Sequence, residues 1–234
     1  MMQRIFGHPN RAVNPRSALL VGASGLVGGH LLKLLLADDA YVRVIVLTRK
    51  PLGSEHSKLL EYVVNFNQLE QHQDRMKGED VFCCLGTTIK TAGSQEAFRR
   101  VNFSYVVQTA AISHKNGARQ FLVISSLSAD VHSRIFYNRV KGEMEEAIAK
   151  IPFDVVKIFR PSLLLGERRE SRPAEALGIF FVKALSILLF RGGMRRYRAI
   201  HAQTVATAML RAAKQQVEGV EILESEEIQS LGQF

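Results

Sequence analysis

The 234-residue sequence predicts an α/β fold built as a doubly wound parallel sheet. Short runs rich in Val, Ile and Leu alternate along the chain with segments of helical length, as in successive βα units. A glycine-rich turn joins the first run to the first helix, and hydrophobic residues make up 47% of the chain, enough for a sizeable core. We expect a basic N-terminal extension over residues 1–16 and a single domain over residues 17–234. Its small C-terminal substrate-side segment is expected at about residues 161–200.

The individual elements follow from this alternation. Strands of a parallel sheet are covered on both faces, so they form short apolar runs rather than alternating ones. The helices between them are expected to begin near Leu26, Leu69, Ser94, Phe136 and Ala202. The six expected strands are Ala18–Val21, Val42–Thr48, Tyr62–Val64, Val81–Leu85, Phe121–Ser125 and Val155–Phe159.

Three glycines follow the first strand at the spacing G-x-x-G-x-x-G. Gly22 allows a sharp turn off the strand, Gly25 lets the backbone approach a pyrophosphate, and Gly28 allows close helix packing. The helix N-terminus adds free N–H groups for the phosphate. A tight βα turn without a ligand is the alternative, but the flanking strand and helix favour the dinucleotide-binding turn of a Rossmann fold. The expected cofactor contacts are Gly22, Ala23, Ser24, Gly25, Leu26, Val27 and Gly28.

The end of the second strand indicates which dinucleotide is bound. A site for NAD usually carries an acidic residue there, facing the adenosine ribose. This chain has Thr48, Arg49 and Lys50 instead. A guanidinium can grip a ribose 2′-phosphate with two hydrogen bonds, so we expect NADP(H), with Arg49 as the main clamp and Lys50 as a supporting charge. A solvated basic turn is the alternative.

The expected catalytic groups lie downstream. A strand ends in Ser125-Ser126, and Tyr137 and Lys141 follow at the spacing Y-x-x-x-K, which places them one turn apart on a helix. A nearby ammonium would lower the pKa of the phenol and hold a ribose, while a serine hydroxyl would orient a carbonyl. We expect Ser126 in that role, with Ser125 as the alternative and Ser128 as a third candidate. The spacing is common by chance on surface helices, but its place after the strand and the glycine turn favours catalysis.

These motifs resemble the short-chain dehydrogenase/reductase superfamily, in its extended or atypical branches. A closer resemblance, from about Ala18 to Leu231-Gly232, is to the Tat-interacting oxidoreductase-like proteins. That resemblance implies an NADPH-binding fold, poorly defined substrates and, in some members, a regulatory role. Such proteins often have an Asp after the third strand, where this chain has Asn65. The residues that carry the closer resemblance are Cys83 to Thr88, Ser125-Ser126 with Ala129-Asp130, Tyr137 through Lys141-Gly142-Glu143, Phe159-Arg160-Pro161 and Glu170 to Pro173.

Further cofactor contacts are expected at the carboxyl ends of later strands, where ligands bind in such sheets. Asn102, on the long helix, is either a structural bridge or a surface amide. The expected contacts are Asn65 and Phe66 after the third strand, Leu85, Gly86 and Thr87 after the fourth, and Pro161, Ser162 and Leu163 beside the nicotinamide.

Charge and composition narrow the partners. The formal net charge is +9, but the basic residues are dispersed, so no nucleic-acid partner is expected. The tightest basic cluster (Arg191, Arg195, Arg196 and Arg198) follows the apolar run Ile179–Phe190. A peripheral membrane contact, a pocket wall and a subunit contact all fit this pattern, and the membrane is not favoured. A homodimer and a regulatory protein partner also stay open.

Cysteine and histidine usage points to a reducing compartment and no metal. The two cysteines, Cys83 and Cys84, are adjacent in an apolar strand, where core packing is favoured over a redox pair. His114 and His201 have no partners at ligand spacing, so both are expected to be structural. No secretory signal or membrane-spanning run is recognised. We expect a cytoplasmic protein.

The expected function is hydride transfer between NADP(H) and an unidentified carbonyl or alcohol substrate. The alternative is an NADPH-sensing regulatory or assembly protein with little or no turnover, since the fold alone does not fix the function.

Overall fold

The computed structural model describes residues 15–166, 198–215 and 217–233. Seven parallel strands form one sheet in the order β3-β2-β1-β4-β5-β6-β9. The predicted doubly wound α/β fold is therefore confirmed, with one more strand than expected. The strands are β1 (Arg16–Val21), β2 (Tyr41–Thr48), β3 (Leu59–Val63), β4 (Asp80–Cys83), β5 (Gln120–Ile124), β6 (Val155–Arg160) and β9 (Gly219–Glu224).

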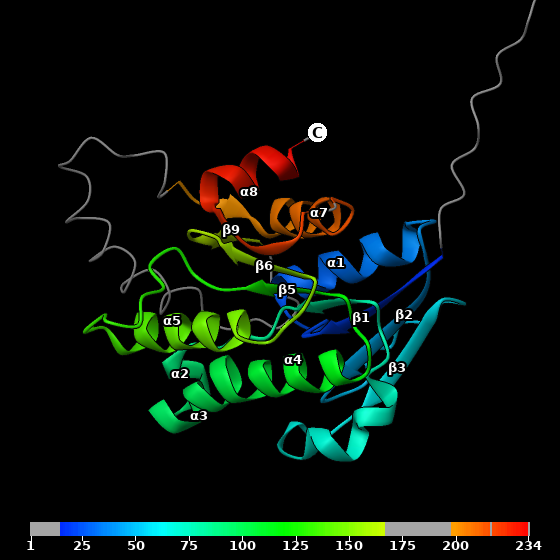
Figure 1. Cartoon of the computed structure of the whole chain (residues 1–234), viewed down its shortest axis with the longest axis horizontal. Helices are drawn as coiled ribbons and strands as arrows, with labels where there is room; N and C mark the ends of the chain where they lie inside the picture. The colour runs from blue at the N-terminus through cyan, green and yellow to red at the C-terminus, as the bar shows by residue number, and fades with distance from the viewer. Residues whose placement is uncertain (1–14, 167–197, 216, 234) are drawn as a thin grey trace, which may run out of the picture.

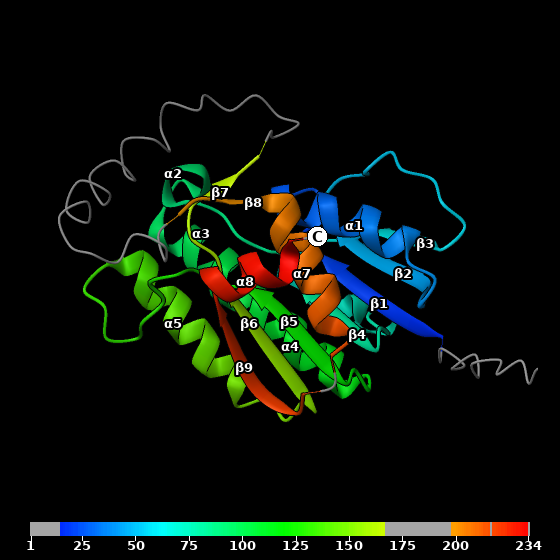
Figure 2. The same ribbon diagram turned by 90° about the horizontal axis from the view of Figure 1, so that it is seen from above.

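Helices cover both faces of this sheet (Figure 1). Helices α1 (Leu26–Ala37), α7 (Ala202–Ala213) and α8 (Ser225–Gly232) pack on one face, which Figure 2 shows toward the viewer. The 3₁₀ helix η1 (Phe66–Arg75) and helices α4 (Tyr105–Lys115) and α5 (Phe136–Ala149) pack on the other. Each face has its own apolar core, because strand residues alternate between the two sides.

The strand order shows where along the sheet a ligand is expected to bind. From β1 the chain builds outward through β2 and β3, and it then returns to place β4 on the other side of β1. The carboxyl ends of β1 and β4 therefore flank the point where the order reverses, which is where open α/β sheets bind ligands. A hydrogen bond of 2.8 Å from the Cys84 N–H to the Val21 carbonyl joins these two strand ends.

The segment between β4 and β5 is more broken than the single long helix expected there. Ser94 caps the N-terminus of α3 (Gln95–Arg99), with its hydroxyl accepting from the Ala97 N–H at 3.1 Å. A π-helical turn, η2 (Arg100–Ser104), then connects α3 to α4. A short helix, α2 (Ile89–Ala92), precedes them. The helix expected near Leu69 begins at Phe66 and is of the 3₁₀ type.

Three strands and one helix near the C-terminus were not anticipated. Strand β9 and helix α8 complete the sheet edge after α7, and β7 (Leu164–Leu165) pairs with β8 (Ile200–His201) in a separate two-stranded ladder. Val220 and Ile222 are exposed on β9, so the strand lacks the continuous apolar run by which central strands were recognised.

Strand β1 begins at Arg16, one residue inside the expected N-terminal extension. Its guanidinium pairs at 2.6 Å with the buried carboxylate of Asp80 at the start of β4. Residues 1–14 lie outside the described residues, as do residues 167–197 of the substrate-side segment, including the run Ile179–Phe190 and Arg191, Arg195 and Arg196. In the described part, no helix is long and apolar enough to cross a membrane, and no cluster of ligand-type side chains could hold a metal ion.

Candidate active site

The glycine turn is fixed by close backbone contacts. Gly22 has φ +89°, and a Cβ added to it would lie 2.6 Å from the Cys84 carbonyl oxygen. A Cβ on Gly28 would lie 2.2 Å from the Gly22 carbonyl oxygen, so α1 packs directly against the turn. Both positions therefore require glycine, the first for conformation and space and the second for space.

The N-terminus of α1 is left open by this turn. Gly25 is the N-cap residue, provides no side-chain cap, and is followed by a first turn without acidic residues. Ser24 and Gly25 are exposed, whereas Ala23 and Val27 are buried in the core. Free N–H groups at a helix N-terminus suit a diphosphate, so a dinucleotide fits this turn. Ala23 and Val27 could contact it only through their backbones.

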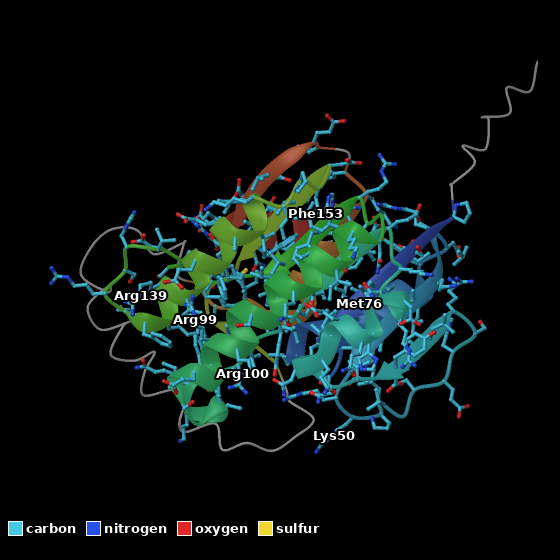
Figure 3. The ribbon with its side chains drawn as sticks, turned by 60° about the horizontal axis from the view of Figure 1, so that its bottom comes forward. Lys50, Met76, Arg99, Arg100, Arg139 and Phe153 are labelled. Atoms are coloured by element: carbon cyan, nitrogen blue, oxygen red, sulfur yellow. The ribbon has the colours of Figure 1, made fainter. Side chains whose placement is uncertain are left out.

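Arg49 and Lys50 lie where the sequence places them, directly after β2. Both are exposed, and no hydrogen bond or ion pair to another described residue engages either side chain. The Thr48 hydroxyl donates to the Lys50 carbonyl at 2.8 Å, which shapes the turn. Figure 3 shows Lys50 projecting away from the ribbon. Both charges are therefore free to meet an anionic group.

Asn65 and Phe66 differ from each other in what they can offer a ligand. The Val64 N–H donates to the Thr48 carbonyl at 2.8 Å, which places the following residues beside the end of β2. The exposed Asn65 side chain caps η1 by accepting from the Asn67 N–H at 3.0 Å. Phe66 is buried in the core with its ring 5.6 Å from that of Tyr105. The Phe66 side chain is thus a core residue, and a cofactor contact there would be through its backbone.

The loop after β4 is held by Asn102 from the π-helical turn. The Asn102 amide oxygen accepts from the Thr87 N–H, and its amide nitrogen donates to the Thr87 carbonyl. Asn102 is 1% exposed, so it is a structural bridge and not a surface amide. Gly86 is exposed, with the Asn102 amide oxygen 3.7 Å from its added Cβ, and Leu85 packs partly against the core. Gly86 and Thr87 therefore stand beside the glycine turn with their backbones fixed.

Ser125 and Ser126 follow β5 and carry buried hydroxyls. The Ser125 N–H donates to the Phe159 carbonyl at 2.7 Å, which fixes the backbone at this strand end. Neither hydroxyl oxygen makes a hydrogen bond of normal geometry within the described part of the chain. Buried polar atoms without partners are rare in folded proteins, and here they indicate a place for a polar ligand group.

Tyr137, in the first turn of α5, lies beside these hydroxyls. Its ring packs on that of Phe98 from α3 at a centroid distance of 5.4 Å. Burial raises the pKa of the Tyr137 phenol, and the nearby Ser126 hydroxyl lowers it by a smaller amount, although the two groups are not aligned as a regular hydrogen bond. Of the two hydroxyls, only that of Ser126 affects the pKa of the phenol.

Lys141 lies one turn further along α5 and is 3% exposed. Its ammonium donates to the Ile124 carbonyl at 3.2 Å. Burial lowers the pKa of Lys141 from 10.5 to about 8, against the opposing effects of Cys83 and Glu145. The expectation that Lys141 lowers the pKa of Tyr137 does not hold in this arrangement, because burial dominates at the phenol and the ammonium is directed to a backbone carbonyl.

The residues expected beside the nicotinamide also serve the fold. The Pro161 carbonyl accepts from the Leu127 N–H at 3.2 Å, and the Leu163 carbonyl accepts from the Ile200 N–H at 2.9 Å. The Ser162 hydroxyl donates to the Arg198 carbonyl and accepts from the Ser225 hydroxyl. These bonds tie the segment after β6 to β8 and α8.

Sequence reasoning missed three residues that shape this site. Phe98 supports the Tyr137 ring, and the buried Glu145 forms an ion pair with the half-buried Arg160 close to Lys141. The i, i+4 spacing of Lys141 and Glu145 was the one signal in the sequence that could have revealed Glu145.

Comparisons with known proteins agree with this geometry. A family model described as NAD(P)H-binding matches residues 22–165. Protein HTATIP2 of Rattus norvegicus is 36% identical over 222 residues, covering 93% of this chain and 89% of the relative. The protein named FMP52, mitochondrial, of Eremothecium gossypii is 30% identical over 222 residues, covering 92% and 96%. The corresponding protein of Emericella nidulans is 33% identical over 173 residues, covering 71% and 74%.

Solved structures share the fold at low sequence identity. The Bordetella bronchiseptica enzyme WbmH in complex with NAD⁺ aligns with a TM-score of 0.68 and 18% identity, covering 91% of this chain and 76% of that chain. UDP-glucose 4-epimerase of Thermotoga maritima, with UDP-glucose, aligns with a TM-score of 0.66 and 16% identity, covering 89% and 76%.

The fungal names correct the expected location. The relatives from Emericella nidulans, Candida albicans and Eremothecium gossypii are all named mitochondrial, so the expectation of a cytoplasmic protein is wrong. Cysteine usage could not have separated these compartments, because a reducing interior is common to both.

Motifs, fold and relatives lead to one assignment. The glycine turn, the sheet reversal beside it and the match over residues 22–165 identify a nucleotide-binding fold. This chain belongs to the NAD(P)H-binding family whose model matches residues 22–165, and HTATIP2 is one of its relatives.

Proposed function

We propose that this chain is an oxidoreductase that uses NADP(H) to interconvert a carbonyl compound and an alcohol. The observation that supports this most is the pair of unpartnered hydroxyls, Ser125 and Ser126, buried next to Tyr137. They follow β5 at the carboxyl edge of the sheet, with β4 between them and the strand that leads into the glycine turn. A purely structural site would be expected to satisfy such groups internally.

The cofactor would be held along this edge. The open N-terminus of α1 would receive the diphosphate, and the backbone at Gly86 and Thr87 would flank it. Lys141 would hold the nicotinamide ribose, and Asn65 would face the adenine. When bound, NADP(H) supplies or takes up a hydride at its nicotinamide ring.

The side chains would handle the proton and the substrate oxygen. With its pKa raised by burial, the Tyr137 phenol stays protonated at neutral pH, so it can donate a proton to a carbonyl oxygen that becomes an alcohol. The Ser126 hydroxyl, beside the phenol, would donate a hydrogen bond to the same oxygen.

Arg49 supports NADP(H) over NAD(H). Its guanidinium is exposed at the end of β2 and free of ion pairs to other described residues, so a bidentate contact with a 2′-phosphate displaces only water. No acidic side chain stands at this strand end to hold an unphosphorylated ribose, since Thr48, Arg49 and Lys50 occupy it.

For location, we infer from the names of the fungal relatives that this chain acts in mitochondria. Fractionation of cells that carry a tagged full-length chain tests this, with mitochondrial enrichment as the expected outcome. Exclusive recovery in the cytosolic fraction would reject it.

The activity is tested with purified full-length protein by following NADPH absorbance at 340 nm against a panel of aldehydes and ketones, and NADP⁺ reduction against the matching alcohols. We expect turnover with at least one class of these carbonyl compounds or alcohols. Tight NADPH binding without turnover on a broad panel would instead favour the sensing role, and no binding of either dinucleotide would reject both.

A further inference from the structure

A line of charged side chains leads from the buried Lys141 through Glu145 and Arg160 to Glu224. Glu145 follows Lys141 by one helical turn on α5 and is 5% exposed. Arg160, at the end of β6, holds both oxygens of this carboxylate, from Nε to Oε1 at 3.1 Å and from Nη2 to Oε2 at 2.5 Å. The remaining Arg160 nitrogen, Nη1, donates to Glu224 on β9 at 3.1 Å.

The two-point contact with Arg160 fixes the position of the Glu145 carboxylate. Bidentate pairing of this kind restricts orientation as well as supplying energy. It also offsets the cost of placing this charge inside the protein, where an unpaired charge would be very costly. Glu145 therefore presents a fixed negative charge to the face of α5 that carries Lys141.

The charged and titratable groups around Lys141 are few in the described part of the chain. From α5 they are Tyr137 and Glu145, and from β4 the group is Cys83, whose thiol pKa burial raises to about 11. Arg160 and Glu224 stand behind Glu145. Since the Cys83 thiol is neutral at pH 7, Glu145 is the only member of this set that supplies a nearby negative charge to Lys141.

We propose that Glu145 is a positioning residue of the active site, whose carboxylate, fixed by Arg160, keeps the buried Lys141 ammonium charged so that it can hold the ribose. The catalytic consequence rests on the proposed function. The electrostatic effect on Lys141 does not, because it depends only on the geometry of α5 and β6.

The two partners of the ion pair should shift the titration midpoint of Lys141 in opposite directions. Glu145→Gln keeps the side-chain shape but removes the negative charge, which should lower the Lys141 titration midpoint by about one pH unit or more. Arg160→Gln removes the cation that offsets Glu145, so the midpoint should rise. A merely structural ion pair would not give shifts of opposite sign.

The test is an NMR titration of full-length protein labelled with ¹³C at lysine Cε, with the Lys141 signal assigned from Lys141→Met. The matched control is Glu146→Gln, which removes the same charge from the next position of α5, where the side chain is exposed. We expect a lowered midpoint for Glu145→Gln, a raised one for Arg160→Gln and no change for Glu146→Gln. Should Glu145→Gln fail to fold, the Arg160→Gln titration still decides.

A Lys141 midpoint that stays at the parent value in the folded Glu145→Gln or Arg160→Gln protein overturns the inference. If turnover is found, Glu145→Gln should also shift the pH profile of kcat/KM in the same direction as the NMR midpoint. If the midpoints move as expected but no variant, including the parent, turns over any substrate, the proposed function fails while the role of Glu145 stands.

Discussion

The side chain of Asn102 and the backbone of Thr87 are hydrogen-bonded in both directions, at 3.4 Å from the Thr87 N–H to Oδ1 and at 3.3 Å from Nδ2 to the Thr87 carbonyl. The same Nδ2 donates to the Phe98 carbonyl at 3.0 Å. Phe98 in turn packs on Tyr137. One buried amide thus connects the loop beside the glycine turn with the residue that supports the phenol.

Asn102→Ala should reduce both stability and cofactor affinity. The change leaves the backbone groups of Thr87 and Phe98 without their partners, which costs about 1–3 kcal/mol in the free energy of unfolding. Because the Gly86–Thr87 loop is released, NADPH affinity should fall as well. Urea denaturation and calorimetric titration measure the two effects, with Gln108→Ala on the exposed side of α4 as the control. Parent-like values for both would contradict the bridging role.

Two neighbouring glycines of α1 should respond in opposite ways to the same substitution. Gly28→Ala places a methyl group 2.2 Å from the Gly22 carbonyl oxygen, so α1 must move and NADPH affinity should be lost or greatly reduced. Gly29→Ala meets its nearest atom, the Ala23 carbonyl oxygen, at an ordinary 3.4 Å. Since Ala is favoured over Gly in helices, Gly29→Ala should stabilise the fold by up to about 1 kcal/mol. Thermal unfolding with and without NADPH compares the stability and the cofactor binding of the two variants. Equal behaviour of both would count against the close packing of α1 on the turn at Gly22.

Arg49→Ala should change the choice of cofactor. Loss of a charge-assisted contact with the 2′-phosphate should weaken NADPH binding about tenfold or more, while NADH binding should hardly change. Isothermal titration with both dinucleotides measures this. Arg43→Ala removes an exposed guanidinium from the interior of β2, away from its carboxyl end, and serves as the control. If the parent protein binds NADH as tightly as NADPH, the assignment of Arg49 is wrong.

Lys141→Met should change how stability depends on pH. A pKa that falls from 10.5 unfolded to about 8 folded means that charged Lys141 costs the folded state about 3 kcal/mol. This cost is present in full below pH 8 and disappears as the pH rises through 10.5. The stability of the variant relative to the parent should therefore be highest near neutral pH and decline by about 3 kcal/mol at alkaline pH. Denaturation series at several pH values test this, and a pH-independent difference would rule it out.

The sequence predicted the central sheet well because its strands are continuous apolar runs between glycine and helix signals. Strand β9 was not predicted, because Val220 and Ile222 face outward at the sheet edge. An edge strand of this kind alternates exposed and buried residues and so lacks a continuous buried apolar run. The π-helical turn Arg100–Ser104 was not predicted either, because such turns are rare, short interruptions within α-helices.

For the site, local motifs were visible and long-range contacts were not. The glycine spacing and the Tyr137–Lys141 pair follow from neighbouring positions in the chain. The pairing of Arg160 with Glu145 depends on how β6 packs beside α5, which no local pattern encodes. The direction of the Tyr137 pKa shift could not be predicted from the sequence either, because it depends on burial and not on the spacing to Lys141.

Under the proposed function, Tyr137 moves the proton in an NADP(H)-dependent reaction. Removal of one hydroxyl should leave cofactor binding intact and reduce proton transfer by about a hundredfold or more. Tyr105→Phe is the matched control, because its hydroxyl bonds Asn67 on the surface. The decisive measurement is kcat, together with the Kd of NADPH, for the parent, Tyr137→Phe and Tyr105→Phe on a substrate found in the panel. We expect a loss of kcat in Tyr137→Phe alone at unchanged Kd, whereas parent-like kcat in Tyr137→Phe would show that this hydroxyl does not move the proton.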